Sequence, residues 1–154
     1  MARKFFEAFY FVTISLWVGG MLAIGYLVAP VLFSSLGDRQ LAGLVAGRLF
    51  ALVGWIGLGS AAYLLIFLVA RQGTGVVKRA PFWLVLLMAL MTAASLFGIQ
   101  PLMVQLKLDA LPREVMDSVL RDRFATWHGI SSILYLLQSL LGLGLVVSGS
   151  RGLK

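Results

Sequence analysis

The chain has 154 residues, of which 60% are hydrophobic and 12% are charged, and its mean hydropathy is +0.97. Because about a quarter of the residues in a water-soluble domain are charged, this composition indicates an integral membrane protein. The lack of cysteine and the single histidine exclude disulfides, thiolate catalysis, cysteine-ligated metal centres and multi-histidine metal sites within one chain.

The first predicted span covers about residues 8–30. The uncharged run from Ala8 to Gly37 exceeds the roughly 20 residues that an α-helix needs to cross a bilayer. Pro30 lies within this run and has no backbone N–H to donate. We therefore expect the helix to break at Pro30 and residues 31–36 to continue along the interface.

Three further uncharged runs predict spans at about residues 49–70, 80–105 and 125–149. The four predicted spans leave no room for a separate soluble module in a chain of this length. The sequence therefore predicts an all-α fold, a polytopic membrane four-helix bundle in which residues 1–154 form a single domain.

Two segments connect the spans on the side away from the termini. Residues 38–47 predict a short, nearly neutral loop. Residues 107–123 predict an amphipathic helix with Pro112 in its first turn, lying on the outer interface. The apolar stripe of this helix would consist of Leu111, Val115 and Val119.

The charges outside the spans predict the orientation. With four spans, the N-terminus, the loop between the second and third spans, and the C-terminus share one side of the membrane. That side holds seven basic residues and one acidic residue, namely Arg3, Lys4, Arg71, Lys78, Arg79, Arg151, Lys154 and Glu7. The opposite side is nearly balanced, so the positive-inside rule places both termini in the cytoplasm. The net charge of +7 thus indicates orientation and contact with the lipid bilayer, and nucleic acid is not an expected partner.

The two halves of the chain resemble each other. At an offset of 72 residues, Trp55-Ile56-Gly57 and Tyr63-Leu64-Leu65 recur as Trp127-His128-Gly129 and Tyr135-Leu136-Leu137. Pro30 and Pro101 lie near the ends of the first and third spans. This internal repeat predicts two parallel helical hairpins related by an axis along the membrane normal. The alternative is chance similarity in a sequence rich in few apolar residue types.

Small residues recur at four-residue spacing, as in Gly43 with Gly47 and Gly57 with Ala61. Such residues let the backbones of membrane helices approach closely. The pattern predicts close packing within the bundle or a homo-oligomer, and it fits both equally well.

Three residues near the outer ends of the spans are candidates for ligand binding. Arg48 and Arg123 open the second and fourth spans, where they would hold an anion, a lipid phosphate or a haem propionate. The alternative is that both side chains simply extend to the interface. His128 is the one titratable group of the fourth span. It is either a haem or metal ligand or proton carrier, or an interfacial histidine bonded to a neighbouring loop.

Trp17, Gly19, Gly20 and Pro30 in the first span are candidates for shaping a cavity. Polar residues distributed over the spans would line a path or would bond between helices; they are Thr13, Ser15, Thr92, Ser95, Gln100, Gln105 and Gln138. No nucleotide-binding loop, serine-hydrolase elbow, zinc-protease motif or pair of intramembrane carboxylates occurs in the sequence. Hydrolytic and nucleotide-driven chemistry therefore lacks its residues, and a catalyst would need a cofactor. The sequence favours a protein that is not an enzyme without deciding the point.

Four short motifs carry a resemblance that covers nearly the whole chain. They are Leu16-Trp17-Val18-Gly19-Gly20, Ala29-Pro30-Val31-Leu32-Phe33, Ala46-Gly47-Arg48-Leu49-Phe50 and Trp127-His128-Gly129-Ile130-Ser131-Ser132. The chain resembles domain-of-unknown-function family 4149, the bacterial relatives of eukaryotic transmembrane protein 205. The resemblance implies a bacterial inner-membrane protein with a role in export or membrane trafficking.

The chain is more distantly similar to the CopD copper-resistance proteins and to HemJ, a protoporphyrinogen oxidase. In those proteins a histidine precedes a Trp-x-Gly-Gly-like element in the first span and is tied to metal or haem handling. Here Trp17-Val18-Gly19-Gly20 is present, but residues 9–16 contain no histidine. The resemblance therefore leaves His128 as the one candidate for an axial haem ligand.

Three hypotheses for function remain. The favoured one is non-enzymatic binding or passage of a small solute or ion without a cofactor, with Arg48, Arg123 and His128 at the outer mouth. The second is a b-type haem protein that uses His128 with a methionine, or one His128 from each of two protomers. The third is a structural subunit or assembly partner of a larger membrane-protein complex.

Overall fold

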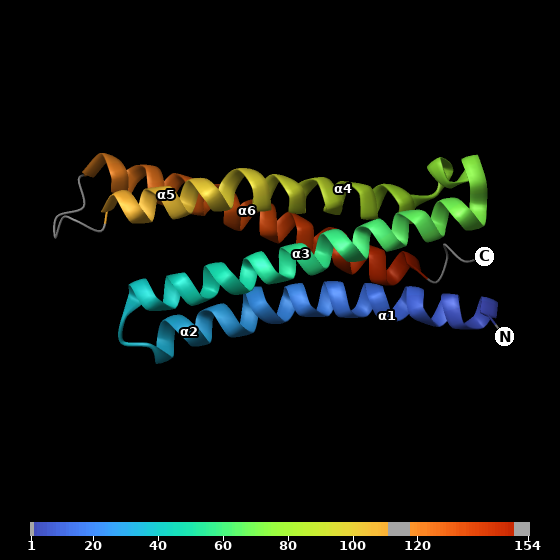
Figure 1. Ribbon diagram of the computed structural model, residues 1–154, viewed down its shortest axis with the longest axis horizontal. Coiled ribbons are helices and arrows are strands. Elements are labelled where there is room, and N and C mark those ends of the chain that lie inside the picture. Colours follow the sequence, from blue (N-terminus) through green and yellow to red (C-terminus); the bar gives the residue numbers. More distant parts are fainter. Residues whose placement is uncertain (1, 111–117, 150–154) are drawn as a thin grey trace.

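The computed structural model describes residues 2–110 and 118–149, and within these ranges all regular secondary structure is helical. Four long helical rods run antiparallel to their chain neighbours (Figure 1). The start of α1 and the end of α6 lie at one end of the bundle, and α2 and α5 lie at the other. The prediction of an all-α four-helix membrane bundle is confirmed.

The first rod consists of α1 (Ala2–Ala23), η1 (Ile24–Val28) and α2 (Ala29–Ser35), and the second is α3 (Arg39–Gln72) followed by η2 (Gly73–Lys78). The third consists of α4 (Ala80–Ala94), η3 (Ser95–Ile99) and α5 (Gln100–Ala110), and the fourth is α6 (Ser118–Gly149). By length and composition, the segments that can cross a membrane are Lys4–Ser35, Arg39–Lys78, Ala80–Leu106 and Asp122–Gly149. These segments contain the four predicted spans.

The predicted loop at 38–47 is wrong, because α3 begins at Arg39. The Asp38 carboxylate caps this helix by accepting hydrogen bonds from the backbone N–H groups of Gln40, at 2.7 Å, and Leu41, at 3.2 Å. An acceptor at this position satisfies N–H groups that have no partner inside the helix. The cap therefore starts α3 well before the uncharged run that indicated the span.

The predicted break at Pro30 is also wrong, because the rod continues as a helix through this position. The π-helix η1 precedes Pro30, and the π-helix η3 precedes Pro101 in the third rod. A widened turn accommodates the proline ring and the hydrogen bond that proline cannot donate. Both rods thus keep their direction across the membrane. The predicted amphipathic segment 107–123 lies partly outside the described residues, which omit 111–117.

The core follows one face of each rod. On α1 it contains Tyr10, Ile14, Trp17, Val18 and Met21, and on the other rods Ala61, Leu64, Leu68, Val76, Val85, Met88 and Leu145. The α1 residues recur at helical spacing, which places them on one stripe facing the bundle. Helix α1 packs against α3 and α6, and α4 packs against the same two helices. The bundle axis is therefore filled by large apolar side chains.

The buried threonine, glutamine and serine side chains of the described residues form hydrogen bonds within the bundle. Thr13 and Thr92 each donate to a carbonyl of their own helix, at 2.8 Å. The Gln138 amide of α6 donates to the Thr92 hydroxyl of α4 at 2.7 Å. The Tyr26 hydroxyl donates to the Ser139 hydroxyl at 3.2 Å. The bonds of Gln138 and Tyr26 join neighbouring helices, and all four bonds satisfy polar groups in an apolar surrounding.

Candidate functional site

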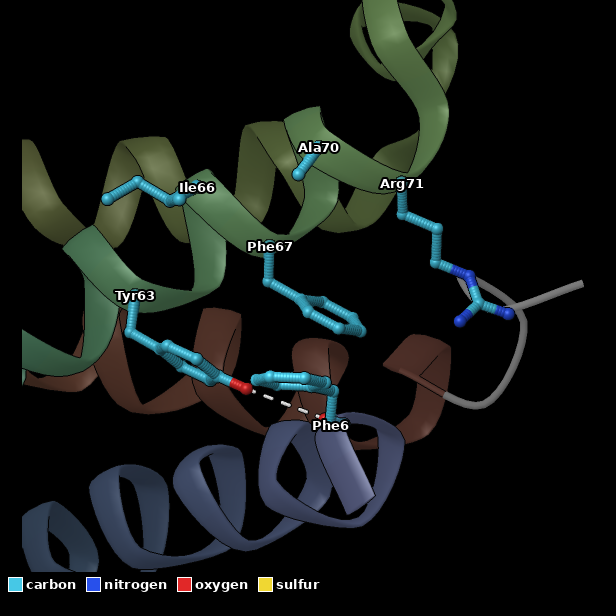
Figure 2. Close-up of a pocket in the computed structure, with 6 residues that line it drawn as sticks. All are labelled: Phe6, Tyr63, Ile66, Phe67, Ala70 and Arg71. Carbon is cyan, nitrogen blue, oxygen red and sulfur yellow. Dashed lines mark hydrogen bonds between the residues drawn. The ribbon is translucent and has the colours of Figure 1, made fainter. Parts of the chain in front are cut away.

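A groove lies between α1 and α3 at the end of the bundle where α1 begins (Figure 2). We call it the aromatic groove; its lining residues are Phe6, Tyr63, Ile66, Phe67, Ala70 and Arg71. Its volume is about 640 Å³. It opens on the outside of the bundle, where 50% of Phe6 and 69% of Ile66 are exposed.

Helical spacing positions the walls of the aromatic groove. Tyr63, Phe67 and Arg71 are spaced four residues apart on α3 and so lie on one side of that helix. Figure 2 shows Tyr63 and Phe67 directed from α3 toward α1, with Arg71 at the end of the groove. The Tyr63 hydroxyl donates to the carbonyl of Phe6 at 3.5 Å. The Tyr63 ring also meets Phe9 edge to face, with the ring centres 4.9 Å apart.

An ion pair between the first two rods lies at the mouth of the aromatic groove. The Arg71 Nη1 atom is 2.6 Å from the Glu7 Oε1 atom. The side chains are 22% and 29% exposed, respectively, so this pair is screened less by solvent than one on an open surface. The exposed basic residues Lys4, Lys78 and Arg79 belong to the same end of the bundle. At the mouth, the Arg71 guanidinium is therefore held by Glu7, and the basic residues around it outnumber the acidic ones.

A second, purely apolar groove runs beside the first. We call it the aliphatic groove; it is lined by Leu65, Ile66, Val69 and Ala70 and has a volume of about 370 Å³. Ile66 and Ala70 line both grooves, so they form a ridge between them on the outer surface of α3. The two grooves thus provide apolar surface side by side, and the Arg71 guanidinium lies at one end of the aromatic groove.

The cavity-shaping residues predicted in the first span lie apart from both grooves. Trp17 is buried in the core, and a Cβ atom built on Gly57 would lie 2.6 Å from its Nε1 atom. Gly19 is exposed and Gly20 is half-buried, and no side chain lies within 4 Å of a Cβ built on either. Pro30 is exposed at the start of α2.

Arg48, Arg123 and His128 are exposed. Arg48 lies in the first third of α3, and Arg123 and His128 lie in the first third of α6. The His128 ring stacks on Phe124, with ring centres 6.1 Å apart and an angle of 5° between the planes. Among the described residues, no group of three or more histidine, cysteine or acidic side chains is placed to hold a metal ion. None of the seven residues predicted from the sequence lines either groove.

Sequence reasoning named Glu7 and Arg71 as charges on one side of the membrane but did not pair them. The signal was present, because antiparallel rods place the start of the first beside the end of the second. Opposite charges at these two positions indicate a contact. The roles of Tyr63 and Phe67 could be found only from the direction of their side chains, since aromatic residues occur throughout the spans.

A protein-family model described as Domain of unknown function (DUF4149) matches residues 12–112. The chain belongs to this family. The match includes most of the first rod, all of the second and third, and all the α3 residues that line the grooves, whereas α6 lies outside it. No curated protein and no solved structure matches the chain. The relations to transmembrane protein 205, CopD and HemJ stay predictions.

Proposed function

We propose that this membrane protein binds an amphiphile with an acidic head group in the aromatic groove, and that it does so without catalysis. The observation that carries the proposal is the Glu7–Arg71 pair at the mouth of a groove with aromatic walls. Guanidinium groups bind phosphate and carboxylate through charge-assisted hydrogen bonds. The rings of Phe6, Tyr63 and Phe67 provide apolar area for the tail of the same molecule.

The positions of Tyr63 and Arg71 along α3 fit an amphiphile whose long axis is parallel to that helix. Tyr63 and Arg71 are separated by eight residues of helix, which corresponds to about 12 Å along the axis. Arg71 lies in the last turn of α3, near the boundary of the span. The head group would therefore bind at the membrane surface, while the tail follows Phe67 and Tyr63 into the apolar layer.

Binding has more support than passage of a solute through the bundle. Large side chains fill the axis, among them Trp17, Met21 and Met88. The buried polar side chains of Thr92 and Gln138 form a hydrogen bond with each other, so they do not support an open polar path. Passage of a solute or ion with Arg48, Arg123 and His128 at the mouth stays a prediction.

The proposal includes the orientation predicted from the charges, with both termini in the cytoplasm of a bacterium and the chain in its inner membrane. The grooves then face the cytoplasmic leaflet, in which anionic lipids attract basic residues. The internal repeat is part of the proposal as well. It is supported by the π-helices η1 and η3, each of which ends two residues before a proline of the repeated pair. A homo-oligomer, haem binding by His128 and assembly with another membrane protein stay predictions.

Binding of dodecyl phosphate, a single-chain acidic amphiphile, tests the proposal. Native mass spectrometry in a mild detergent measures its dissociation constant for the wild type, Arg71→Gln and Arg79→Gln. Arg79→Gln is the matched control, because it removes the same charge at the same end from an exposed residue that lines neither groove. We expect Arg71→Gln to weaken binding about tenfold and the control, which removes one charge of the surroundings but no contact in the groove, to weaken it far less. Equal weakening by both variants, or no binding to the wild type, would refute the proposal.

A further inference from the structure

The aromatic and aliphatic grooves are neighbours on one helix, and only the aromatic groove includes a charged residue, Arg71. Ile66 and Ala70 line both of them, and Arg71 follows Ala70 directly. A molecule with one apolar chain would fill one groove and leave the other to solvent or bulk lipid. A molecule with two chains joined at the head would fill both.

The ridge between the grooves is lowest at the end nearest the head-group position. Ala70 carries only a methyl group, whereas Ile66, one turn deeper, carries a branched side chain that is 69% exposed. A linker between two chains can therefore cross the ridge over Ala70. Below that point Ile66 separates the chains, so each chain contacts a wall of its own.

The charge at this end selects the head group. Lys4, Lys78 and Arg79 are exposed and add to Arg71, while Glu7 is the acidic residue of this end among the described residues. This positive excess favours an anionic head group over a zwitterionic one. The Glu7 Oε1 atom lies 2.6 Å from the Arg71 Nη1 atom, so Glu7 competes with a phosphate for the guanidinium and weakens phosphate binding.

We infer that the two grooves together bind one anionic two-chain phospholipid of the surrounding leaflet. Its phosphate lies at Arg71, its glycerol crosses Ala70, one acyl chain occupies the aromatic groove and the other occupies the aliphatic groove. This inference rests on the proposed function, to which it adds the class of ligand. It assigns a role to Val69 and Leu65, which line only the aliphatic groove.

The test compares phosphatidylglycerol with its single-chain lyso form, by native mass spectrometry in the same detergent. The wild type should bind the two-chain lipid roughly tenfold more tightly, because the second chain buries additional apolar area. Val69→Phe fills the aliphatic groove and should abolish this preference while leaving lyso-lipid binding intact. The matched control is Leu90→Phe on α4, since Leu90 is an exposed apolar residue that lines neither groove. It should keep the preference.

Three results would overturn the inference. They are equal affinity of the wild type for the two lipids, persistence of the preference in Val69→Phe, and equal binding of phosphatidylcholine and phosphatidylglycerol. In each case, binding of dodecyl phosphate that still depends on Arg71 would leave the proposed function standing. If dodecyl phosphate binding did not depend on Arg71, the proposed function would fail as well. The two failures are therefore distinguishable.

Discussion

The ring of Tyr135 packs directly against the backbone of Gly25, inside the π-helix η1. A Cβ atom built on Gly25 would lie 2.2 Å from the Tyr135 Cε1 atom, so only glycine leaves room for the ring. The Tyr135 hydroxyl donates a hydrogen bond to the carbonyl of Met21. These contacts join the first rod to α6 in the half of the bundle beyond the grooves.

Replacing Gly25 by alanine should therefore destabilise the bundle. Pushing the Tyr135 ring aside costs about 1–3 kcal/mol, as for other overpacked cores. Gly98→Ala is the matched control, because Gly98 lies in the other π-helix and a Cβ built on it meets nothing within 4 Å. Unfolding in detergent measures both changes. Equal loss of stability in the two variants would mean that the π-helices, and not the contact with Tyr135, determine the cost.

The buried hydrogen bond between Gln138 and Thr92 should couple α6 to α4. Gln138→Leu and Thr92→Val, singly and together, form a double-mutant cycle for the free energy of unfolding. We expect a coupling energy of about 0.6–2 kcal/mol, the range found between polar groups of membrane helices. A coupling energy of zero would show that the bond does not contribute to stability.

Tyr10→Phe should be neutral or stabilising. Tyr10 is fully buried, and its hydroxyl has no hydrogen-bond partner in the part of the chain that the structure describes. Removing a buried hydroxyl without a partner saves its desolvation cost of about 1–3 kcal/mol. Tyr135→Phe is the contrasting variant, because it loses the bond to Met21 and should destabilise. If Tyr10→Phe were the more destabilising of the two, the Tyr10 hydroxyl would have a partner beyond the described residues.

The haem hypothesis has a direct optical test. Under the proposed function, the protein purified in mild detergent should show no Soret band, because amphiphile binding needs no cofactor. A Soret band in the wild type that disappears in His128→Ala would support haem ligation by His128 instead. Elemental analysis of the same sample measures bound iron and copper independently of the colour.

The four spans were predictable because uncharged runs of this length have few alternatives in a chain this apolar. The start of α3 was not, because the Asp38 cap extends a helix through residues that look like a loop. The continuity at Pro30 was missed for a related reason. Proline removes one hydrogen bond, but the π-turn before it keeps the rod helical. The residues around Pro30 do not indicate in advance whether the helix breaks or forms such a turn.

The candidate site was less predictable than the fold. Reasoning from the sequence favoured Arg48, Arg123 and His128 because titratable residues near a span indicate function. The groove instead depends on side-chain direction, since Tyr63 and Phe67 face α1 while equally aromatic residues elsewhere, such as Trp55 and Trp83, are exposed. The packing of α3 against α1 determines which aromatic side chains face the groove and which are exposed, and the sequence alone does not give this packing.

The most direct test of the central claim compares Glu7→Gln with Arg71→Gln in binding dodecyl phosphate. Both variants break the same ion pair, so a purely structural effect should change the affinity in the same direction. If Arg71 binds the acidic head group, Arg71→Gln should weaken binding about tenfold, whereas Glu7→Gln removes a competitor and should strengthen it. Opposite shifts are the result that we predict. Weakening of the same size in both variants would contradict binding of the head group by Arg71.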